Sequence, residues 1–394
     1  MTLRRAVLLT MAVFALQPLA FGAWLAMIPD VKADLGLGKV ELAVALLGMP
    51  IALIPSLQVA GWMMGRFGPR RVLACALPAT GLALMLPLQA SGQGQLFGAL
   101  AVLGMTFAFS QVALNVYAGR LEKSEDIVVM SRCHGVWAVG LMVGSLAAAT
   151  FISVPGPTRL ALLALASSVP GMICALLLPR LAGSETGAGP KRRSLGQIPG
   201  VLFLISIFAL TIGLAEGAMA DWSAVYLAER WPEGAARAGF AVSLYSGFLA
   251  AGRFLGDVAT ARLGRARLAR LSSVVAILGI VLMVGPWPIL AAFVGCAVVG
   301  LGVSVGYPLA VSATAALDDT YEGANIAVLS TIALTGFLIG PPMIGFLAET
   351  YSLRVGLGVL IPILAAGFVC AAALRARVVP KTGESGADSP QIPG

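Results

Sequence analysis

Ionisable side chains that could bind protons are scarce within the apolar stretches of this chain. Glu216 and Asp221 lie in one stretch, Arg253 and Asp257 in the next, and His134 is the only histidine. A carboxylic acid removed from water can exchange protons near neutral pH, and histidine titrates in the same range. A charge in apolar surroundings costs at least about 2.5 kcal/mol, so each group needs a function or a partner. We therefore take Glu216, Asp221 and His134 as candidates for proton coupling.

Glu216 is the most informative of the three candidates. Its neighbours Ala215, Gly217 and Ala218 leave no bulk beside it that would shield it from a cavity. A proton-coupling role and a structural hydrogen bond to a neighbouring helix both remain open. Asp221 follows five residues later, about 140° around a helix, so we expect it at a helix end or a gate.

The remaining charged groups have simpler interpretations. Arg253 and Asp257 are four residues apart, the spacing at which opposite charges meet on one helix face, and we expect a structural pair. His134 follows Arg132 near the start of its stretch, where a hydrogen-bonded or snorkelling histidine is an alternative to a proton carrier.

Amide and aromatic side chains within the apolar stretches could bind a polar, hydroxylated ligand. Hydrogen bonds between helices, worth about 0.6 kcal/mol each, are the alternative for any one of them. Location of an aromatic ring at the lipid headgroups is a further alternative for Tyr226. The candidates for substrate binding are Gln17, Trp24, Gln111, Asn115, Trp222, Tyr226, Tyr307 and Asn325.

The elements that carry these residues are about twelve apolar runs of roughly twenty residues, the length that crosses a bilayer as a helix. The chain is 59% hydrophobic and only 11% charged. Its mean hydropathy is +0.93. We predict an all-α membrane protein with twelve transmembrane helices. The predicted spans are 6–29, 39–65, 72–91, 95–119, 127–153, 158–179, 200–228, 237–261, 268–286, 288–316, 323–348 and 354–375.

The distribution of Lys and Arg predicts the orientation. If both termini are cytoplasmic, 19 of the 26 cations lie in inside segments and six in outside segments. Cations that flank short loops are retained on the cytoplasmic side. This bias explains the net charge of +8 without a nucleic-acid partner. The sequence also has no Walker loop, no zinc-ligand spacing and no Cys–His pairing, so we expect no cofactor, no metal and no enzymatic activity.

The chain contains two copies of one unit. A polar segment at 182–199 predicts a linker between bundles at 1–181 and 200–376, followed by a disordered cytoplasmic tail at 377–394. An offset of 196 places Arg66-Phe-Gly68 on Arg262-Leu-Gly264, and Gly140-xxx-Gly144 on Gly336-xxx-Gly340. Small-residue contacts such as Gly140-xxx-Gly144 would let the bundles rock against each other.

The loops after the second and eighth spans resemble the cytoplasmic signature Gly-x-x-x-Asp-Arg-x-Gly-Arg-Arg of the major facilitator superfamily. Gly65 and Ala261 stand where the family has its Asp, so the latch that this Asp forms is not carried over. The resemblance covers nearly the whole chain and implies two pseudo-symmetric six-helix bundles and transport by alternating access. The matching residues are Gly61, Arg66, Gly68, Arg70 and Arg71, with a looser copy at Arg253, Asp257, Arg262 and Gly264.

Two segments, 215–227 and 336–349, are similar to bacterial inner-membrane transporters related to the fucose permease. This similarity implies a monomeric secondary transporter that moves a small polar solute, sugar- or polyol-like, together with protons. The alternative is a proton-antiport exporter of drugs or metabolites. Such exporters usually have a Gly-Pro pair in the fifth span, which is absent here, while Gly340-Pro341 lies in the eleventh.

Overall fold

The computed structural model describes residues 3–127, 129–181, 198–317 and 321–375. Within these ranges it contains twelve helical segments long and apolar enough to span a membrane, which confirms the predicted all-α fold. Most of the predicted linker and all of the predicted tail lie outside the described residues.

The helices of the N-terminal half are α1 (Leu3–Leu16), α2 (Leu19–Asp34), α3 (Lys39–Leu46), α4 (Gly48–Phe67), α5 (Pro69–Ala83), η1 (Pro87–Gln89), α6 (Gln93–Glu125), α7 (Met130–Thr150) and α8 (Gly156–Leu177). Those of the C-terminal half are α9 (Gly200–Arg230), α10 (Gly234–Leu263), α11 (Arg265–Val284), α12 (Ile289–Val303), α13 (Gly306–Ala315), α14 (Glu322–Thr350), α15 (Leu353–Gly358), α16 (Leu360–Cys370) and η3 (Ala371–Leu374).

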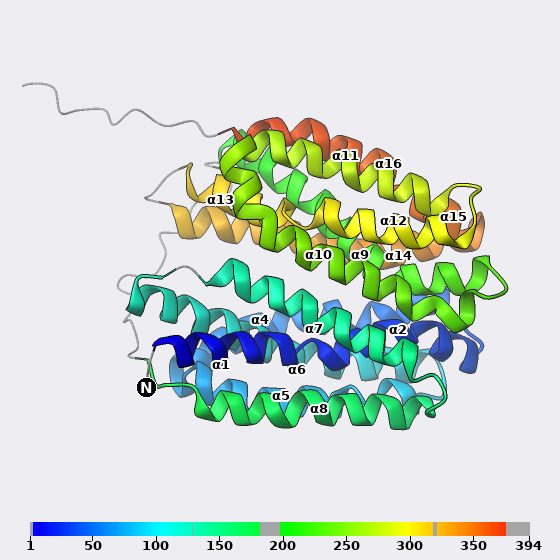
Figure 1. The fold of residues 1–394 in the computed structure, drawn as a ribbon, viewed down its shortest axis with the longest axis horizontal. Helices are drawn as coiled ribbons and strands as arrows, with labels where there is room; N and C mark the ends of the chain where they lie inside the picture. The colour runs from blue at the N-terminus through cyan, green and yellow to red at the C-terminus, as the bar shows by residue number, and fades with distance from the viewer. Residues whose placement is uncertain (1–2, 128, 182–197, 318–320, 376–394) are drawn as a thin grey trace, which may run out of the picture.

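The helices form two bundles that lie side by side, one from each half of the chain (Figure 1). Several spans consist of two shorter helices. The first span breaks between α1 and α2 at Gln17-Pro18, because proline has no backbone N–H to continue the ladder. The tenth span breaks between α12 and α13 at Ser304-Val305. The first break places the polar Gln17 side chain in the middle of a span.

Equivalent glycines have equivalent positions in the two bundles. A Cβ on Gly140 or Gly144 of α7 would meet the carbonyl groups of Ala15 and Leu19 in the first span. A Cβ on Gly336 or Gly340 of α14 would likewise meet the backbone of Leu214 on α9. The two loop glycines, Gly68 and Gly264, also share a left-handed conformation, with φ of 77° and 74°. These matches at one offset support the duplication inferred from the sequence.

The proposed role of the Gly140-xxx-Gly144 contact is corrected by this packing. Both glycines face helices of their own bundle, so they fix the interior of that bundle and do not form a surface between the two. The face of α7 that meets α10 instead carries Gly135, Met142 and Ser145. The face of a helix that a small residue occupies depends on its neighbours, and a sequence motif alone does not specify them.

We expect Gly144→Ala to destabilise the protein by about 1–3 kcal/mol, because the added methyl group collides with the backbone carbonyl of Leu19. Gly98→Ala is the matched control, since a Cβ at Gly98 meets nothing within 4 Å. Thermal unfolding in detergent would measure both. Equal melting temperatures for the two variants would contradict the close contact between α7 and the first span.

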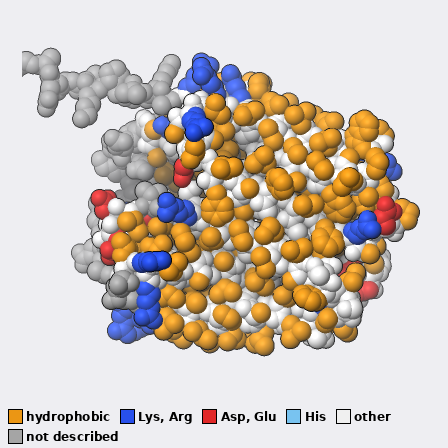
Figure 2. Space-filling model, in the orientation of Figure 1, with side chains coloured by type: hydrophobic (Ala, Val, Ile, Leu, Met, Phe, Trp, Pro, Cys, Tyr) orange, Lys and Arg blue, Asp and Glu red, His pale blue; other side chains and the backbone are white. Residues whose placement is uncertain are grey.

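The surface has an apolar belt between two polar ends. Figure 2 shows hydrophobic side chains covering most of the visible face, with Lys and Arg gathered near the end where the chain begins. We name this the Arg-rich end; it holds the described residues Arg4, Arg5, Arg66, Arg70, Arg71, Arg120, Arg262, Arg265 and Arg267. The opposite end holds Lys32, Lys39, Glu229 and Glu349. A belt of exposed apolar side chains of this kind matches the hydrocarbon core of a bilayer.

Candidate functional site

The central charged group is an ion pair between Glu216 of α9 and Arg253 of α10. The Oε1 atom of Glu216 lies 3.8 Å from the Nη2 atom of Arg253, and both side chains are largely buried. The Nη1 atom of Arg253 also donates a hydrogen bond of 3.3 Å to the carbonyl oxygen of His134 on α7. Arg253 therefore connects a carboxylate of the C-terminal bundle to the backbone of the N-terminal bundle.

This geometry corrects the expected pairing of Arg253 with Asp257. Among the described residues, the carboxylate in ion-pair contact with Arg253 is that of Glu216. Asp257 is exposed, and the order Arg then Asp along a helix is the weaker orientation of an i, i+4 pair. Glu216 is buried and would be far more costly without a cation, so it takes the guanidinium.

His134 lies beside this pair without joining it through its ring. Its imidazole ring makes an edge contact with Phe14 of α1, with ring centroids 5.6 Å apart. Its contribution to Arg253 comes from the backbone carbonyl.

Tyr245, which sequence reasoning missed, is 2% exposed and lies on α10 two turns before Arg253. As an uncharged residue in a helix rich in small side chains, it gave no distinguishing sequence signal.

Gln17 organises a second polar group, within the N-terminal bundle. Its Nε2 atom donates to the Oγ atom of Ser110 on α6 at 3.1 Å, and its Oε1 atom accepts from the Nε1 atom of Trp137 on α7 at 2.7 Å. Both the NH2 donor and the carbonyl acceptor of the Gln17 amide therefore have hydrogen-bond partners. The network joins the break of the first span to α6 and α7, so the side chain of Gln17, a predicted substrate-binding residue, is held in a fixed orientation.

The amides of α6 are less completely satisfied. Asn115 donates through Nδ2 to the carbonyl oxygen of Gln111 at 2.9 Å. The Oε1 atom of Gln111 is buried and has no hydrogen-bond donor among the described residues. A buried acceptor without a donor costs free energy unless a ligand or water supplies one.

The other predicted substrate-binding residues are dispersed. Trp24 and Trp222 are 2% and 0% exposed, and Asn325 is buried in α14. Tyr226 donates to the carbonyl oxygen of Met283, 3.2 Å away on α11, within the C-terminal bundle. Tyr307 is within 3.0 Å of the Ser330 hydroxyl group, at an exposed position. Neither Tyr226 nor Tyr307 bonds to the Glu216–Arg253 pair within the described part of the chain, and Asp221 forms no ion pair with Arg253 there.

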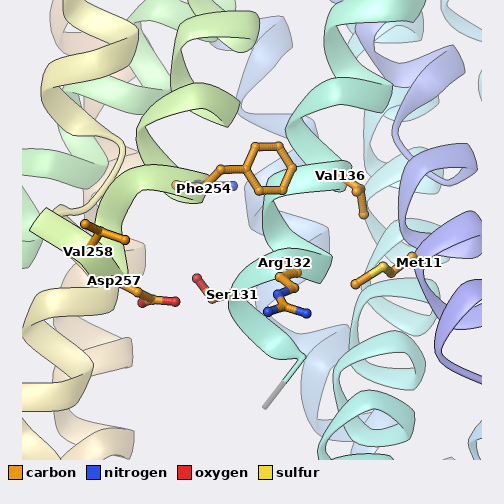
Figure 3. Close-up of a pocket in the computed structure, with 8 residues that line it drawn as sticks. Met11, Ser131, Arg132, Val136, Phe254, Asp257 and Val258 are labelled. Carbon is orange, nitrogen blue, oxygen red and sulfur yellow. The ribbon is translucent and has the colours of Figure 1, made fainter. Parts of the chain in front are cut away.

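A cavity of about 440 Å³ leads to Arg253 between α1, α7 and α10. Figure 3 shows Asp257 of α10 and Ser131 of α7 facing each other across it, with Arg132 beside Ser131. No ion pair joins Arg132 and Asp257, both of which are described. The cavity lining combines these polar groups with apolar side chains, among them Phe254.

The cavity ends where α7 and α10 come into close contact. Gly135 packs against the ring of Phe254, Gly247 against Met142, and the hydroxyl groups of Ser145 and Ser243 are 3.0 Å apart. The two bundles are thus in contact along this line from Gly135 toward the opposite end and separated beyond it toward the Arg-rich end.

Charged residues close the bundles at the opposite end. Glu229 of α9 pairs with Lys32 of α2 at 2.9 Å and with Lys39 of α3 at 3.7 Å. The backbone N–H of Lys39 also donates to Glu349 of α14 at 3.0 Å. Sequence reasoning missed this group, which we call the outer clamp and define as Lys32, Lys39, Glu229 and Glu349. The sequence signal that could have revealed this group is the presence of opposite charges in the predicted outside segments of both halves.

We expect Glu229→Gln to open the outer clamp partially. The two ion pairs of Glu229 are partly exposed and worth about 1 kcal/mol or less each, so the ratio of open to closed molecules should rise by up to about thirtyfold. Distance measurements between spin labels at Ser91→Cys and Glu233→Cys would record the longer population in a background without native cysteines. Glu125→Gln at the Arg-rich end is the control, and identical distance distributions in both variants would contradict the clamp.

The fold, the apolar belt and a buried ion pair reached by a cavity that is open at one end define a multi-pass membrane protein with a transporter architecture. The Major Facilitator Superfamily model matches residues 9–231 of the chain. The chain belongs to this superfamily, and like its relatives it is a transporter and not an enzyme.

Relatives and solved structures agree with this assignment. The chain is 30% identical over 354 residues to an uncharacterized MFS-type transporter of Yersinia pestis, covering 89% of this chain and 90% of the relative. It is 26% identical to the membrane protein MosC of Rhizobium meliloti, covering 91% and 87% of the two chains. A crystal structure of the nucleoside transporter NupG superposes with a TM-score of 0.73 at 14% identity, covering 96% of this chain and 100% of that one. A bacterial homologue of the human lysosomal transporter Spinster, in an inward-facing and occupied conformation, gives 0.67 at 14% identity, covering 94% and 96%. At these identities the structures support the fold alone.

Proposed function

We propose that this protein is a proton-coupled secondary transporter that takes up a small polar solute by alternating access, with Glu216 as the proton carrier. The observation that carries the proposal is the Glu216–Arg253 ion pair, buried between the bundles at the end of a cavity. An intramembrane carboxylate in this position is expensive to maintain and is characteristic of proton relays.

Protonation of Glu216 would change the contact between the bundles. The neutral acid no longer attracts Arg253, whose other contact is the backbone carbonyl of His134 in the N-terminal bundle. The guanidinium must then find another partner, such as a polar group of the solute or a different protein acceptor. Proton binding on one side and release on the other are in this way coupled to rearrangement of α7 against α10.

The solute would bind where an amide of the N-terminal bundle has a hydrogen-bonding atom without a partner in the described part of the chain. The unsatisfied Oε1 atom of Gln111 is an acceptor for a hydroxyl group, and Gln17 is held by its network at the level of the first-span break. We therefore place Gln111 and Asn115 before Tyr226 as solute-binding residues, since the Tyr226 hydroxyl is already engaged with Met283. A ligand with several hydroxyl groups fits such a set of amides.

Closure of the cavity would alternate with opening of the outer clamp. Arg132 and Asp257 carry opposite charges on facing helices across the cavity. When α7 and α10 approach each other at the Arg-rich end, these side chains would pair and take the role that Glu229 and its lysines have at the opposite end. The contact of Gly135 with Phe254 lies at the boundary and would serve as the pivot.

We place the Arg-rich end in the cytoplasm of a bacterial inner membrane. Lys and Arg near short loops are retained on that side, and the described arginines concentrate there. The structure would then be open to the cytoplasm.

A membrane-impermeant thiol reagent added to intact spheroplasts should label Ser91→Cys and spare Glu125→Cys, and the reverse pattern would overturn the orientation.

The direct test is reconstitution into liposomes that contain a pH-sensitive dye. Lumenal acidification when a neutral sugar or polyol is added outside indicates symport.

The alternative, a proton-antiport exporter, gains support from the apolar part of the cavity lining and predicts proton efflux from an acid-loaded lumen when a lipophilic cation is added. Absence of any proton movement with any solute of such a panel, in a preparation that exchanges solute, would overturn proton coupling.

A further inference from the structure

A second pocket, separate from the transport cavity, lies at the Arg-rich end of the N-terminal bundle. It has a volume of about 400 Å³ and is enclosed by the turn between α4 and α5, the last turns of α6 and the end of α8. The turn contributes Arg70 and Arg71, α6 contributes Arg120, and Arg180 follows α8. Four guanidinium groups from three parts of the chain therefore surround one space.

No acidic side chain neutralises these arginines within the described lining of the pocket. The nearby carboxylate of Glu122 on α6 is already used, since its Oε1 atom accepts hydrogen bonds from the backbone N–H groups of Val129 and Met130 at 2.6 and 2.8 Å. Like charges around a confined space repel one another, and the repulsion is relieved when an anion binds between them. The composition of the pocket thus favours a negatively charged ligand.

The pocket walls hold their shape without a ligand. A guanidinium nitrogen of Arg70 donates to the carbonyl oxygen of Leu176, and the Tyr117 hydroxyl group donates to that of Pro179 at 3.0 Å. These two bonds attach the α4–α5 turn and α6 to the end of α8. Arg71 and Arg120 line the same space without taking part in either wall bond, so their guanidinium groups can turn toward a ligand.

We infer that this pocket binds the phosphate group of an anionic phospholipid of the cytoplasmic leaflet. Arginine presents paired donors that match phosphate oxygens, and basic pockets between transmembrane helices on the cytoplasmic side bind lipid headgroups in this way. The pocket lies at the boundary of the apolar belt, and Phe67 and Leu176 line it beside the arginines, as the glycerol and upper acyl region of a lipid requires. The inference rests on the cytoplasmic placement of the Arg-rich end and not on the identity of the transported solute.

The C-terminal bundle supplies an internal comparison. At the offset of 196, Tyr117 corresponds to Ala313, Arg120 to Ala316 and Arg70 to Ala266. The turn glycine and two arginines beside it are retained at Gly264, Arg262 and Arg267. The turn and its membrane orientation therefore do not require Tyr117 or Arg120. Tyr117 and Arg120 therefore occur only in the half of the chain that forms this pocket.

Binding can be tested with the full-length protein in a neutral detergent. Purified protein would be titrated with phosphatidylglycerol, with phosphatidylcholine and with inorganic phosphate, and bound ligand would be followed by native mass spectrometry and by the shift in melting temperature. We expect phosphatidylglycerol to bind and stabilise, and Arg71→Gln/Arg120→Gln to weaken that binding by about tenfold or more. These two arginines are chosen because the wall-forming bonds of Arg70 and Tyr117 remain.

The matched control is Arg262→Gln/Arg267→Gln, which removes two exposed arginines from the equivalent region of the C-terminal bundle. This variant should bind phosphatidylglycerol as the unmodified protein does. Equal weakening in both double variants would reduce the effect to general surface charge and overturn the site. Binding of phosphatidylcholine with the same affinity would overturn the requirement for an anionic headgroup. Inorganic phosphate that binds as tightly through Arg71 and Arg120 would assign the pocket to a soluble phosphate and overturn the lipid.

Discussion

Glu216→Gln is expected to abolish concentrative uptake while leaving solute exchange across the membrane intact. Glutamine has the size of protonated glutamic acid but binds no proton, so the inward proton gradient can no longer drive the solute. One coupled proton supplies about 1.4 kcal/mol per pH unit, so a gradient of one unit sustains about a tenfold accumulation, and the variant should lose it. Labelled solute uptake into proteoliposomes with and without an imposed pH gradient measures the loss.

Two controls separate proton coupling from general damage. Glu125→Gln removes an exposed carboxylate at the Arg-rich end of α6 and should accumulate solute normally. Solute counterflow, which needs no gradient, should persist in Glu216→Gln because the helices can still rearrange with a neutral group at this position. Accumulation by Glu216→Gln equal to that of the unmodified protein would show that another group carries the proton.

A disulfide between cysteines at Arg132 and Asp257 is expected to stop transport, and reduction should restore it. These residues lie on opposite sides of the open cavity, so their cysteine replacements can join only when α7 and α10 close at this end. The crosslink would hold the protein closed at the Arg-rich end and prevent return to the observed open state. Oxidation of the double variant in a background without native cysteines, followed by an uptake assay, measures the effect.

A second crosslink provides the complementary state. The hydroxyl groups of Ser145 and Ser243 are 3.0 Å apart, so cysteines at these positions should join readily in the observed conformation and also stop transport. Each single-cysteine variant, treated with the same oxidant, should remain active. Continued uptake after the cysteines at positions 132 and 257 have formed their disulfide would contradict closure at this end.

The charge exchange Arg132→Asp/Asp257→Arg should recover activity that either single reversal loses, if the two residues pair in the closed state.

The overall architecture could be predicted because the bilayer imposes strong constraints on sequence. A span needs about twenty apolar residues and satisfies its backbone within one helix, so each span is recognisable locally. The helices nonetheless extend beyond the apolar cores: the fourth predicted span, 95–119, is a helix from Gln93 to Glu125. Polar residues at helix ends project into water, where hydropathy gives no signal.

The partners of the buried charges could not be predicted in the same way. The sequence identifies Glu216 because an acid within an apolar span is conspicuous, but spacing along one helix pairs Arg253 with Asp257 instead. The observed pair joins two different helices, and the second contact of Arg253 is a backbone carbonyl of a third. Contacts of this kind depend on how helices are arranged around each other, which a single sequence does not encode in any local pattern.

The outer clamp and the cavity illustrate the same limit. Lys32 and Lys39 are far from Glu229 in the sequence, and all three lie at the ends of spans, where charged residues are ordinary. Only the packing of the two bundles shows that they meet. The absence of the family's loop Asp, replaced by Gly65 and Ala261, fits a protein in which other charges hold the closed ends together.

The most direct test of proton binding by Glu216 is infrared difference spectroscopy of the reconstituted protein between high and low pH. Protonation of a buried glutamate produces a carboxylic C=O band, and selective isotope labelling of glutamate identifies its source. The account predicts one such band in the unmodified protein that is absent from Glu216→Gln and retained in Glu125→Gln. Identical difference spectra for the unmodified protein and Glu216→Gln would show that Glu216 binds no proton and would contradict the mechanism.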